Sequence, residues 1–126
     1  MNREEILNLS DEEINRLIAT KWMGWKPTDN PNIVIMDDRD WICLVPSLGG
    51  SWMPSTNLSD AMEALERFKN KVVVTIKLIG DRYDITLIGY KEAAVLREKS
   101  LPKAICQCIL LYLNEKEHEE RITKEE

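Results

Sequence analysis

The sequence predicts an α+β fold: a small antiparallel sheet with helices packed on it, an α-β-α sandwich. Three patterns support this class: helix-spaced apolar residues after Ser10, two pairs of strand-like segments, and a nearly all-apolar segment after Pro102. Helices that flank antiparallel hairpins are typical of α+β architecture. Residues 1–126 suit a single domain, with its core at about 10–114 and a charged C-terminal tail at 115–126.

The first long helix is expected to begin at Ser10. Ser10 and Glu13 form a capping box in the sequence, and apolar side chains then recur at helical spacing as far as Trp22. Gly24 follows at the position where a helix commonly ends. A shorter capped turn over residues 2–5 precedes this helix.

Two β-hairpins are expected. Residues 32–36 and 41–45 are short, apolar and β-branched, and a charged turn separates them. Residues 71–78 and 81–88 alternate more regularly, with Ile79-Gly80 as the tight connection. These four segments supply the predicted sheet.

Two more helices follow from the pattern. Asn57 is a plausible N-cap for an amphipathic helix over residues 58–69. The last helix opens near Pro102 and is apolar around most of its circumference, so it is expected to be central. Residues 91–99 have helical propensity but stand between breakers, and they are expected to form a loop with a possible helical turn.

Charge and composition exclude several kinds of partner. A net charge of −5 and a pI of about 5.0 argue against DNA, and no run of Lys and Arg suggests a local basic patch. The longest apolar segment, residues 104–113, is too short to span a bilayer, and the N-terminus has no signal-peptide pattern. No membrane association is expected, and the cytoplasm is the expected compartment.

The sequence contains few residues that could bind a metal or a cofactor or carry out catalysis. Cys106 and Cys108 are two residues apart on a helix and His118 is the single histidine, so no metal site and no cofactor are expected. Common nucleophile and phosphate-loop motifs are missing from the sequence. Asp37, Asp38 and Asp40 could bind a divalent cation, although a solvated turn explains them better. We expect no catalytic residues and no enzyme.

The long loop over residues 46–60 is the expected binding region. It joins a strand to a helix N-terminus and combines Gly and Ser with a Trp and a Met, which is unusual for a solvated loop. Tryptophan rings can stack on a nucleobase, and hydroxyls and amides at a helix N-terminus can hold a phosphate. The candidate ligand-binding residues are Trp25, Lys26, Arg39, Gly50, Ser51, Trp52, Ser55 and Thr56.

A structural interpretation of the same residues stays open. Trp22 and Trp41 could fill the core, and the segment 55–57 could serve only to cap a helix. For Trp25 and Trp52 the two interpretations are evenly balanced.

Three short elements resemble those of the phage ABA-sandwich domain family. Residues 19–25 (ATKWMGW) are similar to its (V)AEKVMGW element, residues 55–57 (STN) to its YSTD element, and residues 102–106 (PKAIC) to its P-x-AIC helix start. Pro54 and Asn57 stand where the family usually has Tyr and Asp. The resemblance implies a small α-β-α sandwich encoded by a phage or prophage, in a family whose members mostly lack an assigned activity.

Together these observations suggest a non-enzymatic binding protein in the bacterial host cytoplasm. By analogy with similar small phage proteins, it would be a counter-defence factor that sequesters a small anionic nucleotide, such as a cyclic nucleotide immune signal. A homo-oligomer is expected, formed through Trp52-Met53 or the last helix. The alternative is a protein–protein interaction module that inhibits a host factor, and a nuclease using residues 37–40 is a weaker third option.

Overall fold

The computed structural model describes residues 1–36, 40–48 and 50–125. Its helical elements are α1 (Arg3–Leu7), α2 (Asp11–Leu17), the π-helical turn η1 (Ile18–Trp22), α3 (Leu58–Glu66) and α4 (Leu101–Glu125). Its strands are β1 (Lys26–Pro27), β2 (Ile33–Met36), β3 (Asp40–Cys43), β4 (Val73–Ile79), β5 (Arg82–Ile88) and β6 (Glu92–Glu98).

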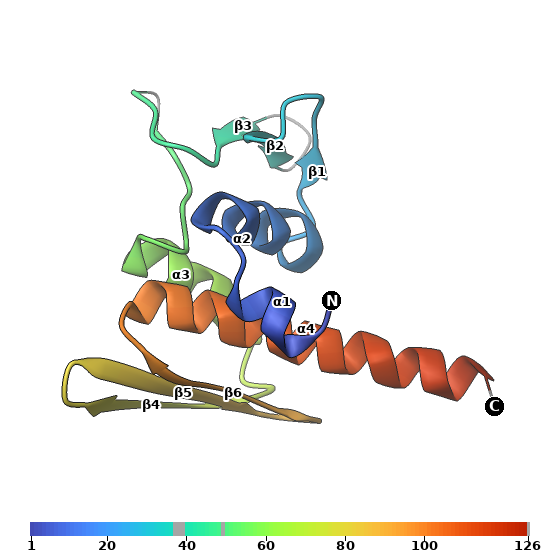
Figure 1. Cartoon of the computed structure of the whole chain (residues 1–126). Coiled ribbons are helices and arrows are strands. Elements are labelled where there is room, and N and C mark those ends of the chain that lie inside the picture. Colours follow the sequence, from blue (N-terminus) through green and yellow to red (C-terminus); the bar gives the residue numbers. More distant parts are fainter. Residues whose placement is uncertain (37–39, 49, 126) are drawn as a thin grey trace.

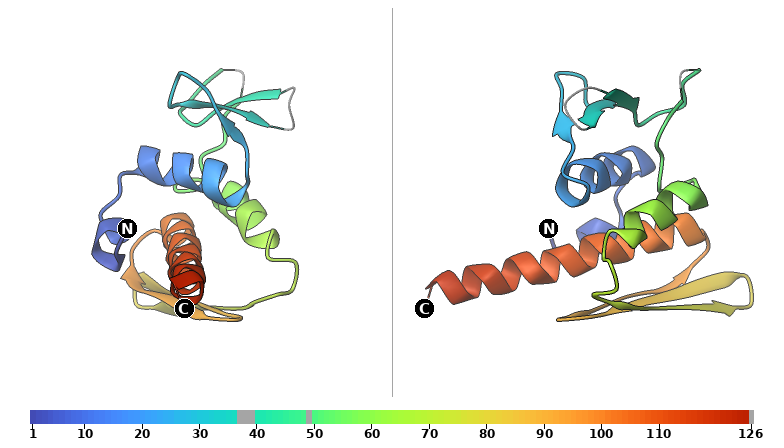
Figure 2. Two further views of the ribbon diagram at one scale, coloured as in Figure 1. Left: turned by 90° about the vertical axis from the view of Figure 1, so that its right-hand side faces the viewer. Right: turned by 180° about the vertical axis from the view of Figure 1, so that it is seen from behind.

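The strands form two separate antiparallel sheets, in the orders β1-β2-β3 and β4-β5-β6. Figure 1 shows α4 lying along one face of the β4-β5-β6 sheet, with α2 and α3 on the other side of α4, and Figure 2 shows α1 beside α4. The small β1-β2-β3 sheet lies beyond α2. The predicted α+β class is confirmed, but the strands are divided between two sheets.

Helix α4 is the centre of the molecule, as its apolar circumference predicts. Its residues from Ala104 to Tyr112 are buried, because the sheet covers one side and the shorter helices cover the other. The left view of Figure 2 looks along α4 and shows it enclosed in this way. The segment expected as a charged tail continues the same helix to Glu125.

Local capping patterns in the sequence correspond to observed helix starts. Asn2 and Ser10 each complete a capping box, and Asn57 accepts a hydrogen bond from the backbone N–H of Asp60 at 3.0 Å. The first long helix is α-helical only as far as Leu17 and then widens into the π-helical turn η1. Gly24, with φ of 76°, follows its end.

Both predicted hairpins are present as the antiparallel pairs β2–β3 and β4–β5. The prediction of a loop at residues 91–99 is wrong, because this segment forms β6 and pairs with β5. Ala93 and Val95 face α4 and are buried, so their burial outweighs the local preference for helix. The two-residue strand β1, which pairs with β2, was not predicted.

The three cysteines are free thiols, as expected for the chain. Cys106 and Cys108 are both fully buried on α4, and the Cys108 Sγ lies 3.3 Å from the Ala93 carbonyl oxygen. Burial raises the pKa of the Cys108 thiol to about 12, and it also raises that of Cys106. Both side chains therefore remain protonated thiols in the core.

Candidate functional site

Trp25 and Trp52 are brought together, but inside the core. Only 9% of Trp25 and 4% of Trp52 is exposed, and the two ring centroids are 4.7 Å apart in an edge-to-face arrangement. The Trp52 Nε1–H donates a hydrogen bond to Glu63 Oε2 at 2.9 Å. In this structure the pair anchors the 46–60 loop to the end of η1 and to α3.

The hydroxyl residues of the loop serve its own geometry. Ser55 is buried; its backbone N–H donates to Asn15 Oδ1 at 2.9 Å and its hydroxyl donates to the Asp11 carbonyl at 3.4 Å. Thr56 is exposed and lies 3.5 Å from the Met53 carbonyl. A side chain already caps the N-terminus of α3, since Asn57 Oδ1 accepts from the Asp60 N–H at 3.0 Å, and the Asp60 carboxylate accepts from the Met53 N–H of the loop at 2.9 Å.

The other described candidates from the sequence are exposed, unlike the buried tryptophan pair. Lys26 is exposed on β1, while Gly50 and Ser51 are exposed in the loop, where Gly50 has φ of 95°. Arg39 lies outside the described residues, as do Asp37 and Asp38 of the acidic turn. Within the described residues, no group of three or more His, Cys, Asp or Glu side chains could hold a metal ion.

Trp41 is not a core residue, contrary to the structural interpretation of the sequence. It is 70% exposed on β3, which is an edge strand of the small sheet. The strand is only four residues long. An exposed tryptophan therefore stands on the surface of the β1-β2-β3 sheet.

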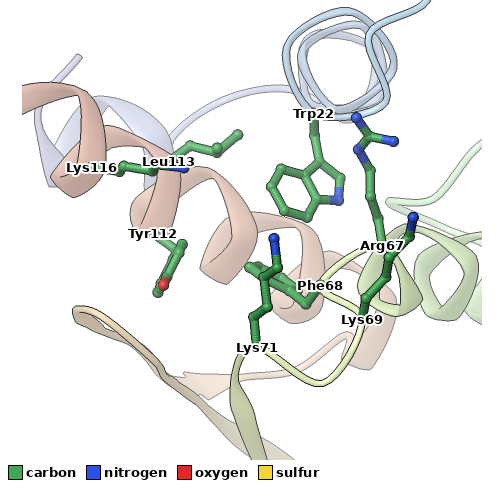
Figure 3. Close-up of a pocket in the computed structure, with 8 residues that line it drawn as sticks. All are labelled: Trp22, Arg67, Phe68, Lys69, Lys71, Tyr112, Leu113 and Lys116. Carbon is green, nitrogen blue, oxygen red and sulfur yellow. The ribbon is translucent and has the colours of Figure 1, made fainter. Parts of the chain in front are cut away.

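A cavity of about 320 Å³ opens where η1, the end of α3 and the middle of α4 meet. This volume is at the lower end of the range for small-molecule sites. Figure 3 shows its lining side chains, which are Trp22, Arg67, Phe68, Lys69, Lys71, Tyr112, Leu113 and Lys116. We call this cavity the Trp22 pocket.

Three aromatic rings form the apolar part of the Trp22 pocket. The ring centroids of Trp22 and Phe68 are 4.5 Å apart, and those of Phe68 and Tyr112 are 5.3 Å apart. The Trp22 Nε1–H donates to the Ala64 carbonyl at 2.7 Å, which fixes the orientation of the indole. Phe68 and Tyr112 are buried, whereas Trp22 is half-buried and keeps part of its ring accessible.

The rim of the pocket is cationic. Arg67, Lys69, Lys71 and Lys116 are exposed, and the described lining contains no carboxylate. The Arg67 guanidinium carbon lies 5.8 Å from the centroid of the Trp22 ring, within cation–π distance. In Figure 3 the Lys71 side chain points toward Trp22. Four cations therefore gather at one mouth of a chain whose net charge is −5.

The backbone around the pocket has two special features. Lys69 and Asn70 both have left-handed φ values, 49° and 67°, a conformation that is costly for a lysine. Gly89 permits a close approach, because a Cβ there would stand 2.7 Å from the Tyr112 hydroxyl and 2.9 Å from the Lys71 carbonyl oxygen. Both features shape the segment that carries Phe68 and Lys71.

Sequence reasoning missed this pocket because its residues come from three distant segments. A signal was nevertheless present: Arg67, Lys69 and Lys71 are three cations within five residues, at the end of a helix. The sequence has no run of Lys and Arg that suggests a local basic patch, and these three closely spaced cations were overlooked. Only the fold adds Trp22 and Lys116 to this cluster.

Comparison with known proteins supports the expected family. The fold is similar to the crystal structure of a phage protein from Bacillus cereus ATCC 14579, with a TM-score of 0.61 and 25% sequence identity. The similarity covers 82% of this chain and 91% of that one. The search of curated proteins gave no match.

No helix in the described part of the chain is both long enough and apolar enough to cross a membrane. The Phage ABA sandwich domain matches residues 16–108, which include η1, α3 and the start of α4. This match spans most of the chain and includes all three elements on which the resemblance was based. The chain therefore belongs to the Phage ABA sandwich domain family.

Proposed function

We propose that this protein binds a small anionic ligand with a flat ring, of the nucleotide class, in the Trp22 pocket and sequesters it without turnover. The observation that carries the proposal is the composition of the pocket: three aromatic rings and four cations, with no carboxylate in its described lining. The proposal keeps the ligand class expected from the sequence and assigns it to a different place.

Each half of such a ligand has a matching group. The accessible part of the Trp22 ring offers a stacking surface for a base, an interaction worth about 1–3 kcal/mol. Lys69 and Lys71 offer flexible charges for a phosphate, and charge-assisted hydrogen bonds contribute about 1.5–3 kcal/mol each. Arg67 can remain beside the indole or turn toward the phosphate. The pocket therefore favours a ligand that is both planar and anionic over one that is only anionic.

Binding without turnover fits the chemistry of the lining. Among the described lining residues there is no carboxylate, thiol or imidazole to act as a general base or nucleophile. The cavity volume suits a single nucleotide unit better than a larger ligand. For a member of a phage family, holding a cyclic nucleotide immune signal in this way would act as counter-defence in the host cytoplasm.

The proposal is tested by titrating the protein with cyclic AMP, cyclic di-AMP, ATP and inorganic phosphate while Trp fluorescence and native mass are recorded. We expect at least one nucleotide to bind, and to be released intact on heating, while phosphate alone binds more weakly. Lys69→Glu/Lys71→Glu should abolish binding, because it reverses two charges at the rim. The matched control is Lys99→Glu, an exposed lysine outside the pocket.

Two results would overturn the proposal. One is that none of the nucleotides binds more tightly than inorganic phosphate. The other is that Lys69→Glu/Lys71→Glu binds as tightly as the parent chain. Chemical conversion of a bound nucleotide would contradict the non-enzymatic part alone.

The exposed Trp41 favours a second candidate, a protein–protein interaction module that inhibits a host factor. Tryptophan is enriched among residues that dominate binding energy at interfaces, and this ring is 70% exposed. The previously expected surface at Trp52-Met53 is less suitable because Trp52 is buried. If Trp41→Ala abolishes inhibition of the host factor while nucleotide binding is unchanged, the interaction module describes the function better than nucleotide sequestration does.

A further inference from the structure

We propose that a second copy of this chain pairs antiparallel with the free edge of β4, so that two β4-β5-β6 sheets join into one. Strand β4 lies at one end of this sheet and pairs only with β5. Within the described residues, no backbone hydrogen bond outside the β4–β5 ladder involves residues 73–79. Seven residues of strand therefore present an unpaired edge.

This edge lacks the features that usually protect edge strands from pairing. Val73, Leu78 and Ile79 are 64%, 64% and 58% exposed, and Ile76 is also exposed. Lys77 is the single charge in the strand, and there is no proline or bulge. Long, apolar and regular edges of this kind are templates for another strand.

The opposite edge of the same sheet shows the contrast. Strand β6 carries three charged residues in seven, and its pairing with β5 is irregular between Tyr83 and Ile85. Arg97 there has a left-handed φ of 58°, and its backbone N–H donates to Asp84 Oδ1 at 2.8 Å. One edge is thus irregular and charged, while the other is regular and apolar.

The sequence of β4 selects a second copy of itself as the partner. With a two-fold axis through Ile76, Val73 lies opposite Ile79, Val74 opposite Leu78, and Ile76 opposite its own copy. Lys77 then lies opposite Thr75, so no like charges meet. Every apolar residue of the strand gains an apolar neighbour, which is the pairing that stabilises antiparallel sheets.

Neighbouring registers are less favourable. An axis through Lys77 sets the two lysines directly opposite one another, and like charges at that position are destabilising. An axis through Thr75 sets Val73 against Lys77. The register centred on Ile76 is therefore the one we predict, and the interface lies outside both places expected from the sequence, Trp52-Met53 and the last helix.

Charge variants at the predicted pair Val73–Ile79 test both the interface and its register. Analytical ultracentrifugation of the full chain should show self-association. Val73→Lys/Ile79→Lys places like charges opposite each other twice and should raise the dissociation constant at least about tenfold. Val73→Lys/Ile79→Glu places opposite charges there and should stay within about threefold of the parent chain. Leu96→Lys, a 61% exposed leucine on β6, is the matched control and should change nothing.

A chain that stays monomeric at the highest soluble concentration would overturn the proposal, as would equal effects of the two β4 variants. Should the variants fail to fold, hydrogen exchange of the unaltered chain decides the matter. The β4 amides should be protected more strongly at high than at low protein concentration. Protection in β4 that does not depend on concentration would refute the interface. Because nucleotide binding is not needed for this test, its result is independent of the proposed function.

Discussion

Gly89 lies directly against Tyr112, so closely that a Cβ at position 89 would stand 2.7 Å from the tyrosine hydroxyl. The same Cβ would stand 2.8 Å from Val72 Cγ1 and 2.9 Å from the Lys71 carbonyl oxygen. The glycine therefore sets how near the chain leading into β4 comes to α4. The spacing of two pocket residues, Lys71 and Tyr112, depends on this contact.

Gly89→Ala is expected to destabilise the fold by about 1–3 kcal/mol, the usual cost of forcing extra volume into a packed site. Urea unfolding followed by circular dichroism measures this change. Tyr112→Phe in the same chain removes the closest atom, so the double variant should recover part of the loss. If the two substitutions are simply additive, the proposed contact is not the cause.

Lys69→Gly should stabilise the protein, by up to about 1 kcal/mol. The left-handed φ of 49° costs a lysine about 1–2 kcal/mol, and the greater freedom of glycine in the unfolded chain offsets about half of that gain. Lys71→Gly removes the same charge, but Lys71 is not among the residues with positive φ, so this control should lose stability. Chemical denaturation of both variants would show opposite signs, and a loss in Lys69→Gly would contradict the argument.

Asn15→Ala should destabilise the chain by about 1–3 kcal/mol, because it leaves the buried backbone N–H of Ser55 without an acceptor. Asn15 is 3% exposed and Ser55 is 1% exposed, so water cannot easily replace the bond. Thr56→Ala, next to it but exposed, should change stability by less than about 0.5 kcal/mol. Thermal unfolding of the two variants distinguishes the outcomes, and equal effects would refute the anchoring role of Asn15.

Stability should fall as the pH rises above 9. Burial raises the pKa of the Cys108 thiol from 9.0 to about 12 and also raises that of Cys106, so the folded chain keeps protons that the unfolded chain releases. Below pH 9 each buried thiol makes its full contribution to the free energy of unfolding. Above pH 9 that contribution falls by about 1.4 kcal/mol per pH unit for each thiol. Cys106→Ala/Cys108→Ala should flatten the profile of unfolding free energy measured from about pH 8 to 10.5. An unchanged slope would show that other groups cause it.

Much of the helical structure could be predicted because its signals are local. Ser10 with Glu13, and Asn57 before α3, satisfy backbone groups only three residues away, so the printed sequence contains both partners. The apolar circumference of α4 likewise indicates a central helix. The π-helical turn η1 was not visible, because apolar spacing alone does not distinguish it from an α-helical turn.

Predictions that depended on distant neighbours were less successful. Residues 92–98 form a strand because β5 and α4 enclose Ala93 and Val95. The sequence of the segment itself does not indicate these contacts. The exposure of Trp41 was missed for the same reason. The balanced interpretations of Trp25 and Trp52 also required knowing that the two rings meet.

The sequence by itself determined the starts of the main helices, the two hairpins, the α+β class and the family, since each depends on contacts between residues close in the chain or on short motifs. Only the tertiary structure decided which aromatic rings lie against cations. Trp22, Arg67 and Lys116 are far apart in sequence and meet because α4 must be covered on all sides. The 46–60 loop, which attracted attention by its composition, is bound to the core through Trp52 and Ser55. The Trp22 pocket arises from packing between helices, which no single segment encodes.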